Sequence, residues 1–270
     1  MLRSMTCALA LALGLLALAP DASAQGQATL DKYTNRGQFQ VQTMSVSGFT
    51  LFLPVGRPAG SPILTWGNGT GASPNTYSGL LNQWASYGII VVASTSSSTG
   101  TGSQMVQGIG VAQGSSVGGG NTVCTSGHSQ GGSGAVNAAR DSRVDCAMPI
   151  ELDNTFTATS NGADLSGKPS LILCGTSDSL APCGSATSTR NGNEIFNQSA
   201  GPVVIAFRQG ATHFTPTGSG TNAFTGISTA WLVGNMFGNA DARALFFGPS
   251  PQLVGLSGWV NLRFKGTSGL

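Results

Sequence analysis

The sequence predicts an α/β fold, with a mostly parallel central sheet flanked by helices in a single layered domain. Apolar segments typical of strands alternate along the chain with segments of helical periodicity, which is the pattern of a parallel sheet with crossover helices. Residues 89–94 (IIVVAS) form a continuous apolar run, as expected for a strand that is buried on both faces. The chain has 270 residues, of which 40% are hydrophobic, and this is enough for one large core.

The individual elements follow from periodicity in chain order. Tyr77, Leu80, Leu81 and Trp84 share helical spacing, and Gly88 suits the end of that helix. The other elements are predicted from apolar runs, alternation and turn residues in the same way. They are antiparallel strands within residues 40–54, strands at 62–66, 89–94, 121–127, 144–152, 169–175 and, as the last clear one, 202–209, a weak helix near 104–109, and helices at 132–140 and 221–237.

The first 24 residues have the features of a secretory signal peptide. Arg3 supplies a positive charge, and residues 8–19 are apolar but too few to span a bilayer. Ala22-Ser23-Ala24 matches the A-x-A pattern of a cleavage site. We therefore expect residues 25–270 to form one exported domain, either extracellular or periplasmic, without a membrane anchor.

Charge is sparse along the whole chain. Only 8% of the residues are charged, and the formal net charge is +2. Nucleic-acid binding requires a stripe of Lys and Arg that neutralises phosphates. We therefore expect no nucleic-acid partner, and we expect a monomer.

The cysteines indicate disulfides rather than a metal site. Four cysteines follow the predicted leader, and an even number in an exported chain allows three pairings. Zinc is disfavoured because the spacing does not match paired C-x-x-C motifs and the chain has only two histidines. Neither a metal nor an organic cofactor is expected. The four residues are Cys124, Cys146, Cys174 and Cys183.

A glycine loop at residues 67–72 (GNGTGA) follows the strand at 62–66 and formally matches the dinucleotide-binding pattern G-x-G-x-x-[GA]. Such a site also needs an acidic residue about 20 positions further on, which holds the ribose hydroxyls. No Asp or Glu occurs between Asp31 and Asp141, and the lysine of a phosphate-binding loop is missing as well. We interpret the loop as a source of backbone N–H groups at the end of a strand.

A possible nucleophile stands between a predicted strand and a predicted helix. Gly127-His128-Ser129-Gln130-Gly131 matches G-x-S-x-G in the order that the motif requires. The serine of this motif lies on a sharp turn, and the two glycines let the turning backbone pack closely. The N-terminal N–H groups of the following helix point toward developing negative charge. The pattern also arises by chance in a chain rich in Gly and Ser, so its partners decide the interpretation.

A serine nucleophile needs a general base, which is almost always histidine. Only His128 and His213 are available. His128 is a poor candidate, because neighbouring side chains on a sharp turn diverge and a third group cannot easily orient it. His213 follows the strand at 202–209, and we predict that it is the base.

The third member is an acid that orients the histidine, and in this chain order it lies between the serine and the histidine. Asp178 follows the strand at 169–175, at the edge of the sheet where the acid is expected, and it is our prediction. Asp153 also follows a strand and is the runner-up. The remaining acids in this interval are Asp141, Asp145, Glu151, Asp164 and Glu194.

An oxyanion formed on such a serine requires two N–H donors. Gln130 is predicted to supply one of them, as the residue after the nucleophile. The second is predicted from the glycine loop. Asn68 is our first choice there, and Gly69 is the alternative.

The segments TWGNGTG, LNQWASYGIIVVAS, GHSQGG, TSDSLAP and GATHF resemble bacterial cutinases and the related polyester hydrolases in order and approximate spacing, over roughly residues 40–235. The resemblance implies an α/β-hydrolase fold and a secreted serine carboxylic-ester hydrolase that acts through an acyl-serine intermediate. It also implies that Ser129, Asp178 and His213 form a catalytic triad and that Asn68 and Gln130 form the oxyanion hole. The residues expected to line the substrate site are His128, Leu180 and Trp66.

Several alternatives stay open at this stage. Acetyl or feruloyl polysaccharide esterases and lipases share the implied fold, and so would a peptidase, an amidase or a binding protein on an inactive hydrolase scaffold. For the cysteines, our hypothesis is that Cys124 pairs with Cys146 between neighbouring strands. Cys174 would then pair with Cys183 and hold the loop that carries Asp178.

Overall fold

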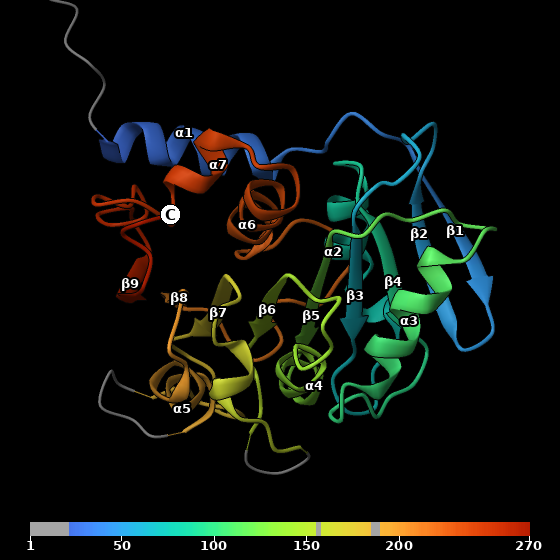
Figure 1. Cartoon of the computed structure of the whole chain (residues 1–270). Coiled ribbons are helices and arrows are strands. Elements are labelled where there is room, and N and C mark those ends of the chain that lie inside the picture. The colour runs from blue at the N-terminus through green and yellow to red at the C-terminus, as the bar shows by residue number, and fades with distance from the viewer. Residues whose placement is uncertain (1–21, 155–157, 185–189) are drawn as a thin grey trace, which may run out of the picture.

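The computed structural model describes residues 22–154, 158–184 and 190–270, and one twisted sheet runs through this part of the chain (Figure 1). The sheet has nine strands in the order β1-β2-β4-β3-β5-β6-β7-β8-β9. The strands from β4 to β8 in this order are mutually parallel, whereas β1 and β2 at one edge and β9 at the other are antiparallel to their neighbours. The prediction of a mostly parallel α/β sheet is therefore confirmed.

The strands are short, as is usual for this architecture. They are β1 (Val41–Val46), β2 (Phe49–Pro54), β3 (Ile63–Gly67), β4 (Ile90–Ser94), β5 (Val123–His128), β6 (Cys146–Ile150), β7 (Ser170–Gly175), β8 (Val203–Arg208) and β9 (Trp259–Lys265). The α-helices are α1 (Ala22–Thr34), α2 (Ser78–Ala85), α3 (Ser103–Gln113), α4 (Gln130–Ala138), α5 (Asn191–Gln198), α6 (Thr225–Phe237) and α7 (Ala240–Ala244). Two short 3₁₀ helices are η1 (Pro74–Tyr77) and η2 (Gly162–Leu165).

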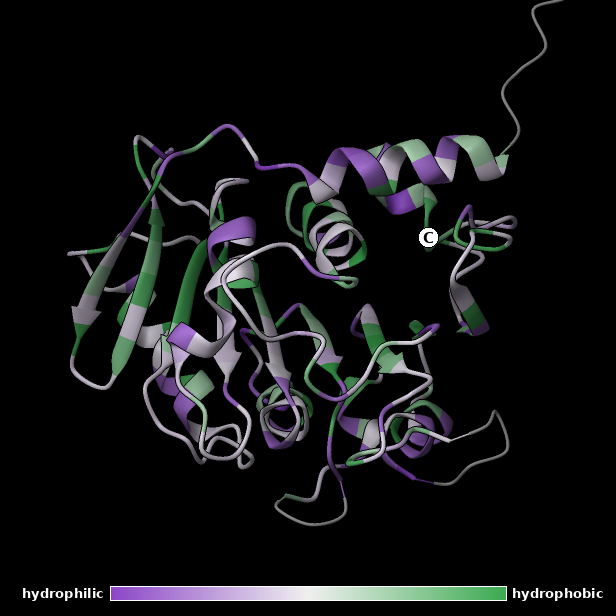
Figure 2. Cartoon of the chain, turned by 180° about the vertical axis from the view of Figure 1, so that it is seen from behind, coloured by the Kyte–Doolittle hydropathy of each residue, from purple (hydrophilic) through white to green (hydrophobic). Residues whose placement is uncertain are grey.

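Helices cover both faces of the sheet, which explains the continuous apolar runs of its central strands. Helices α3, α4 and α5 pack on one face, and α2 and α6, with α1 and α7 behind α6, lie on the other (Figure 1). Successive residues of a strand enter opposite cores: Leu64 and Val91 pack with Trp84 and Trp231, whereas Ile63 packs into the second core. Figure 2 shows the apolar residues concentrated in the strands at the centre of the molecule.

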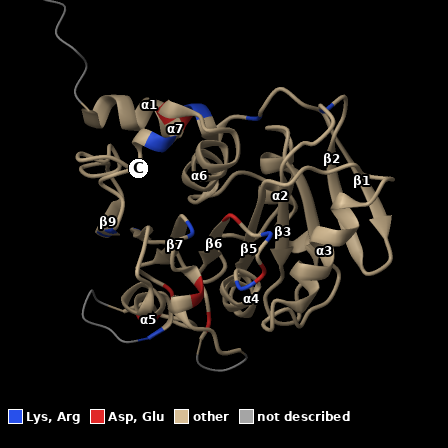
Figure 3. Ribbon diagram, viewed as in Figure 1, with Lys and Arg blue, Asp and Glu red and all other residues tan. Residues whose placement is uncertain are grey.

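Charged residues are few, and they are scattered over several elements and loops of the described chain (Figure 3). None of the described helices is both long and apolar enough to cross a bilayer. Most of the predicted leader lies outside the described residues, and Ala22–Ala24, the predicted cleavage site, form the first turn of α1.

The structure adds elements that the sequence did not predict, namely α1, α5, α7 and β9. Helix α5 is rich in Asn, which has a low helix propensity. The burial of Ile195 and Phe196 against β7 and β8 stabilises it. In β9, apolar residues alternate with Asn261, Arg263 and Lys265, which is the pattern of a half-buried edge strand. The alternation is present in the sequence. The structure shows that β9 follows residues 202–209, the predicted last clear strand.

The four cysteines form two disulfides, as predicted. Cys124 and Cys146 lie directly opposite each other on β5 and β6 and are bonded. Cys174, near the end of β7, is bonded to Cys183. The second bond closes the loop that contains Asp178. The first turn of helix α5 packs closely against this disulfide. Gly192 allows the approach, because a Cβ there would lie 2.8 Å from each of the two sulfur atoms.

Candidate active site

The predicted site residues meet at one edge of the sheet, where the parallel strands have their carboxyl ends. Ser129 follows β5, Asp178 follows β7 and His213 follows β8. The loop after β3 brings Gly69 to the same edge. Open α/β sheets form their sites at this edge because successive loops converge there.

Ser129 has the strained backbone of a tight strand-to-helix turn. Its φ is 56° and its ψ is −127°, a conformation that non-glycine residues adopt only where the surroundings impose it. The flanking glycines allow this turn. A Cβ at Gly127 would lie 2.1 Å from the Gly131 carbonyl oxygen, and one at Gly131 would lie 2.2 Å from the Gly67 carbonyl oxygen. The spacing of G-x-S-x-G therefore has a steric cause in this fold.

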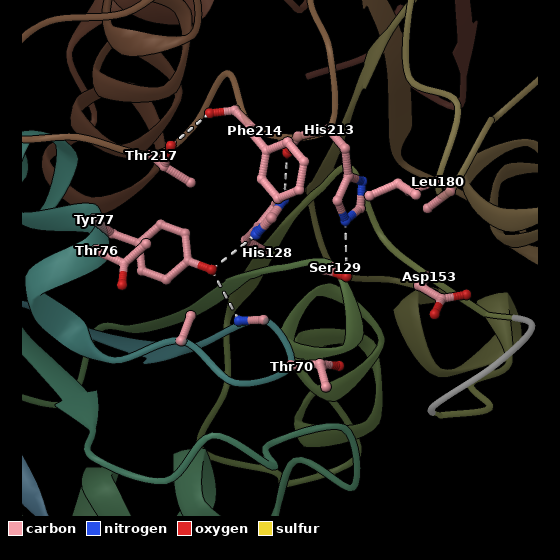
Figure 4. A pocket seen from close by; sticks show the side chains of 13 residues that line it. Thr70, Thr76, Tyr77, His128, Ser129, Asp153, Leu180, His213, Phe214 and Thr217 are labelled. Atoms are coloured by element: carbon pink, nitrogen blue, oxygen red, sulfur yellow. Dashed lines mark hydrogen bonds between the residues drawn. The ribbon is translucent and has the colours of Figure 1, made fainter.

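Ser129, His213 and Asp178 form one hydrogen-bonded array. Nε2 of His213 lies 3.0 Å from Ser129 Oγ (Figure 4). Nδ1 of the same ring lies 2.8 Å from Asp178 Oδ2. Because a carboxylate only accepts, Nδ1 carries the proton that it donates to Asp178, and Nε2 is then free to accept from the serine hydroxyl. The side chains of all three residues are largely buried.

Asp178 is held as an ionised group. The N–H groups of Leu180 and Ala181 donate to its Oδ1 at 2.8 and 2.9 Å. Burial raises the pKa of Asp178, but hydrogen bonds from His213, Glu151 and the Ala181 N–H outweigh it, so the pKa lies below its ordinary value. An ionised acid in this position fixes the His213 ring and stabilises its protonated form.

His128 cannot act as the base, because both of its ring nitrogens are engaged. Nε2 lies 2.7 Å from the backbone oxygen of His213, so it must donate, and Nδ1 accepts from the Tyr77 hydroxyl at 2.9 Å. The Tyr77 oxygen in turn accepts the Gly69 N–H at 3.0 Å, and Figure 4 shows this chain of hydrogen bonds. His128 thus links the glycine loop to the loop that carries His213.

The neutral form of His128 is the one that this chain of hydrogen bonds requires. Burial and the neighbouring His213 lower the pKa of His128 from 6.5 to about 3. Burial also raises the pKa of Tyr77 to about 12, so its hydroxyl keeps the proton that it donates.

This lowered pKa predicts a loss of stability in acid. The unfolded chain binds a proton on His128 below about pH 6.5 and the folded chain does not, so stability is complete above pH 6.5 and falls as the pH drops toward 3. By pH 4 the free energy of unfolding should have fallen by about 3 kcal/mol from this residue alone. Urea unfolding at pH 7 and pH 4 measures the loss. His128→Gln should remove most of it, and an equal loss in both proteins would contradict the assignment.

A cavity of about 360 Å³ opens beside Ser129 and His213. The hydroxyl groups of Thr70 and Thr76 lie on one wall of the cavity, and Leu180 and Phe214 form an apolar rim (Figure 4). Leu180 is 53% exposed and Phe214 is 63% exposed, which is unusual for large apolar side chains. The lining of the cavity therefore combines hydroxyl groups and the Asp153 carboxyl with an apolar surface at the mouth.

The structure brings most of the other predicted residues to this cavity, but not all. His128 and Leu180 line it, and so does Asp153, the runner-up acid, whose N–H donates to the Ser129 carbonyl. The acid bonded to His213 Nδ1 is Asp178. Trp66 does not line it: its side chain is fully buried in the core beside Tyr77 and Trp84, and the prediction that it contacts substrate is wrong.

The side chains of the two predicted oxyanion residues are buried and bonded to backbone carbonyl groups of residues 94–97. Gln130 is the first residue of α4, and its side chain donates to the Ser97 carbonyl. Asn68 is fully buried, and its amide donates to the carbonyl groups of Ser94 and Ser96, which anchors the glycine loop. Its neighbour Gly69, the alternative, lines the cavity.

Sequence reasoning missed three residues of this site. They are Tyr77, for which helical spacing is the only local signal, Phe214, and Glu151, which is one of seven acids between Ser129 and His213. Phe214 directly follows His213, so its place at the mouth could have been expected. No local pattern indicates the contacts of Tyr77 or Glu151.

No protein-family model matches this chain, and a search of curated proteins finds no similar sequence.

Proposed function

We propose that the protein is a secreted serine carboxylic-ester hydrolase of the α/β-hydrolase fold. The observation that carries the proposal is the hydrogen-bonded array of Ser129, His213 and Asp178 on a strained strand-to-helix turn beside a cavity. The resemblance to bacterial cutinases and polyester hydrolases supports it. The two disulfides fit an oxidising compartment outside the cytoplasm.

Each step of the proposed reaction uses a group in this array. His213 Nε2 takes the proton of Ser129 as Oγ attacks the ester carbonyl carbon, and Asp178 stabilises the protonated ring. The N–H groups of Gln130 and Asn68 donate to the oxyanion, since the Gly69 N–H already donates to the Tyr77 hydroxyl. His213 then returns the proton to the leaving alcohol, which leaves an acyl-serine. Water, activated by His213 in the same way, releases the acid and restores Ser129.

The cavity favours an uncharged ester with an apolar acyl or alcohol part. The rim formed by Leu180 and Phe214 stands open, so a chain longer than the cavity can extend over it. We therefore propose polyester or cutin-like esters as the first candidates. Acylglycerols and acetylated or feruloylated polysaccharides are the alternatives on the same site.

The proposal is tested by labelling and by a substrate panel. A fluorophosphonate probe, which reacts with activated serines, should label the wild-type protein and not Ser129→Ala. The panel should contain p-nitrophenyl esters of increasing chain length, a matched amide, an acetylated xylan and a polyester film. Ester turnover without amide turnover is the expected result. An unlabelled, inactive wild-type protein would indicate a binding protein on a hydrolase scaffold and would overturn the proposal.

A further inference from the structure

A second buried carboxyl lies behind the proposed triad. Glu151 directly follows β6, and its side chain has no exposure to solvent. Its φ is 45°, one of the few positive values outside glycine in the described residues. A strained backbone and a buried acid at the same position indicate that the fold maintains this arrangement against a free-energy cost.

The two oxygens of Glu151 have different surroundings. Oε2 accepts the Gly175 N–H at 2.9 Å. Gly175 allows this approach, because a Cβ there would lie 2.5 Å from Glu151 Oε1. Oε1 is buried and accepts no hydrogen bond from any residue that the structure describes. The Glu151 carboxyl lies against the start of the loop that carries Asp178, because Gly175 donates its N–H to Glu151 and accepts the Asp178 N–H on its carbonyl oxygen at 3.4 Å. The pKa values of both carboxyls are shifted by their mutual interaction.

Two buried carboxyls in contact cannot both be ionised. Asp178 accepts from His213, Leu180 and Ala181, so it is the one that stays charged. The proton therefore belongs on Glu151. If Oε1 carries it, this oxygen is a hydrogen-bond donor, which explains why no described group donates to it. Burial, together with the contact with Asp178, raises the pKa of Glu151 to about 10, and the Gly175 N–H offsets this only in part.

We propose that Glu151 is a positioning residue of this site, a neutral carboxylic acid whose O–H donates a hydrogen bond to the Asp178 carboxylate. The titratable groups on its neighbouring loops are Asp178 and, beyond it, His213. The proton stays on Glu151 throughout the reaction. Glu151 holds the Asp178 carboxylate in place against His213 Nδ1 without adding a second negative charge. This inference rests on the proposed function.

Two substitutions separate the hydrogen bond from the charge. In Glu151→Gln the amide can donate to Asp178 and accept from Gly175, so kcat should stay within about threefold of wild type, whereas Glu151→Leu should lower kcat about tenfold or more with little change in KM. Glu194→Gln is the matched control at the only other glutamate of the chain. The proposal is overturned if Glu151→Gln loses as much activity as Glu151→Leu, or if Glu151→Leu keeps wild-type kcat.

Two further measurements do not depend on ester hydrolysis or on the folding of Glu151→Leu. Infrared difference spectra at pH 7 should show the carbonyl stretch of a protonated carboxylic acid in the wild type and in Glu194→Gln, and lack it in Glu151→Gln. Because the folded pKa is raised above the ordinary value of 4.5, wild-type stability should fall relative to Glu151→Gln as the pH rises above 4.5. If the band is absent from the wild type and the stability difference is constant, Glu151 is ionised and the inference fails, even where esters are hydrolysed. If the band and the slope are present in a protein that hydrolyses no ester, the protonated Glu151 stands and only the proposed function fails.

Discussion

Ser129→Ala is expected to lower the turnover of a p-nitrophenyl ester by about 10⁶-fold, as removal of the nucleophile does in comparable serine hydrolases. Ser129 is the one group of the array whose oxygen can form a bond to the acyl carbon. The small residual rate over water would come from the oxyanion donors and from substrate binding, which the substitution leaves in place. Steady-state kinetics of the purified protein, with active-site titration of the wild type, measure the effect.

The control for this experiment is Ser103→Ala, an exposed serine at the start of α3 that is not among the residues lining the cavity. It makes the same chemical change and should keep wild-type turnover. A Ser129→Ala protein within tenfold of wild type would show that another group performs the reaction. The substitution should leave the fold intact, because Ser129 forms its helix contacts through its backbone.

The two histidines should differ by several orders of magnitude. His213→Ala should lower turnover about as deeply as Ser129→Ala, by about 10⁶-fold, because the nucleophile then has no base. His128→Gln should lower it by only about tenfold, the effect of weakening one hydrogen bond that supports the His213 loop. The structural reason is that His213 contacts both Ser129 and Asp178, whereas His128 contacts Tyr77 and the His213 carbonyl.

Kinetics of both variants on one ester provide this comparison, and the chain offers no third histidine that could complicate it. Circular dichroism of each variant at pH 7 should match the wild type. A loss in His128→Gln as deep as that in His213→Ala would reverse the assignment of the base.

Much of the site could be anticipated from local patterns. The turn at Ser129 needs glycine at 127 and at 131, because a Cβ at the first position would collide with the backbone of α4 and one at the second with the end of β3. The order of serine, acid and histidine after successive strands restricts the partners to a few residues. The run at β4 could be recognised because burial on both faces favours an unbroken run of apolar residues from Ile90 to Ala93. These features could be predicted because they depend only on neighbouring residues or on the order of the elements along the chain, and the sequence contains both.

The remaining features depend on contacts between distant segments, which no local pattern records. The side of the sheet that Trp66 enters is decided by pairing within the sheet, and it takes the ring into the core and away from the cavity. The role of His128 depends on Tyr77, 51 positions earlier, and on a backbone oxygen 85 positions later. The state of Glu151 depends on its contact with Asp178 in the absence of water. The sequence by itself determined which residues could take part in chemistry at the edge of the sheet. The tertiary structure decided the partners and protonation of each one, because burial and hydrogen bonding between loops exist only in the folded chain.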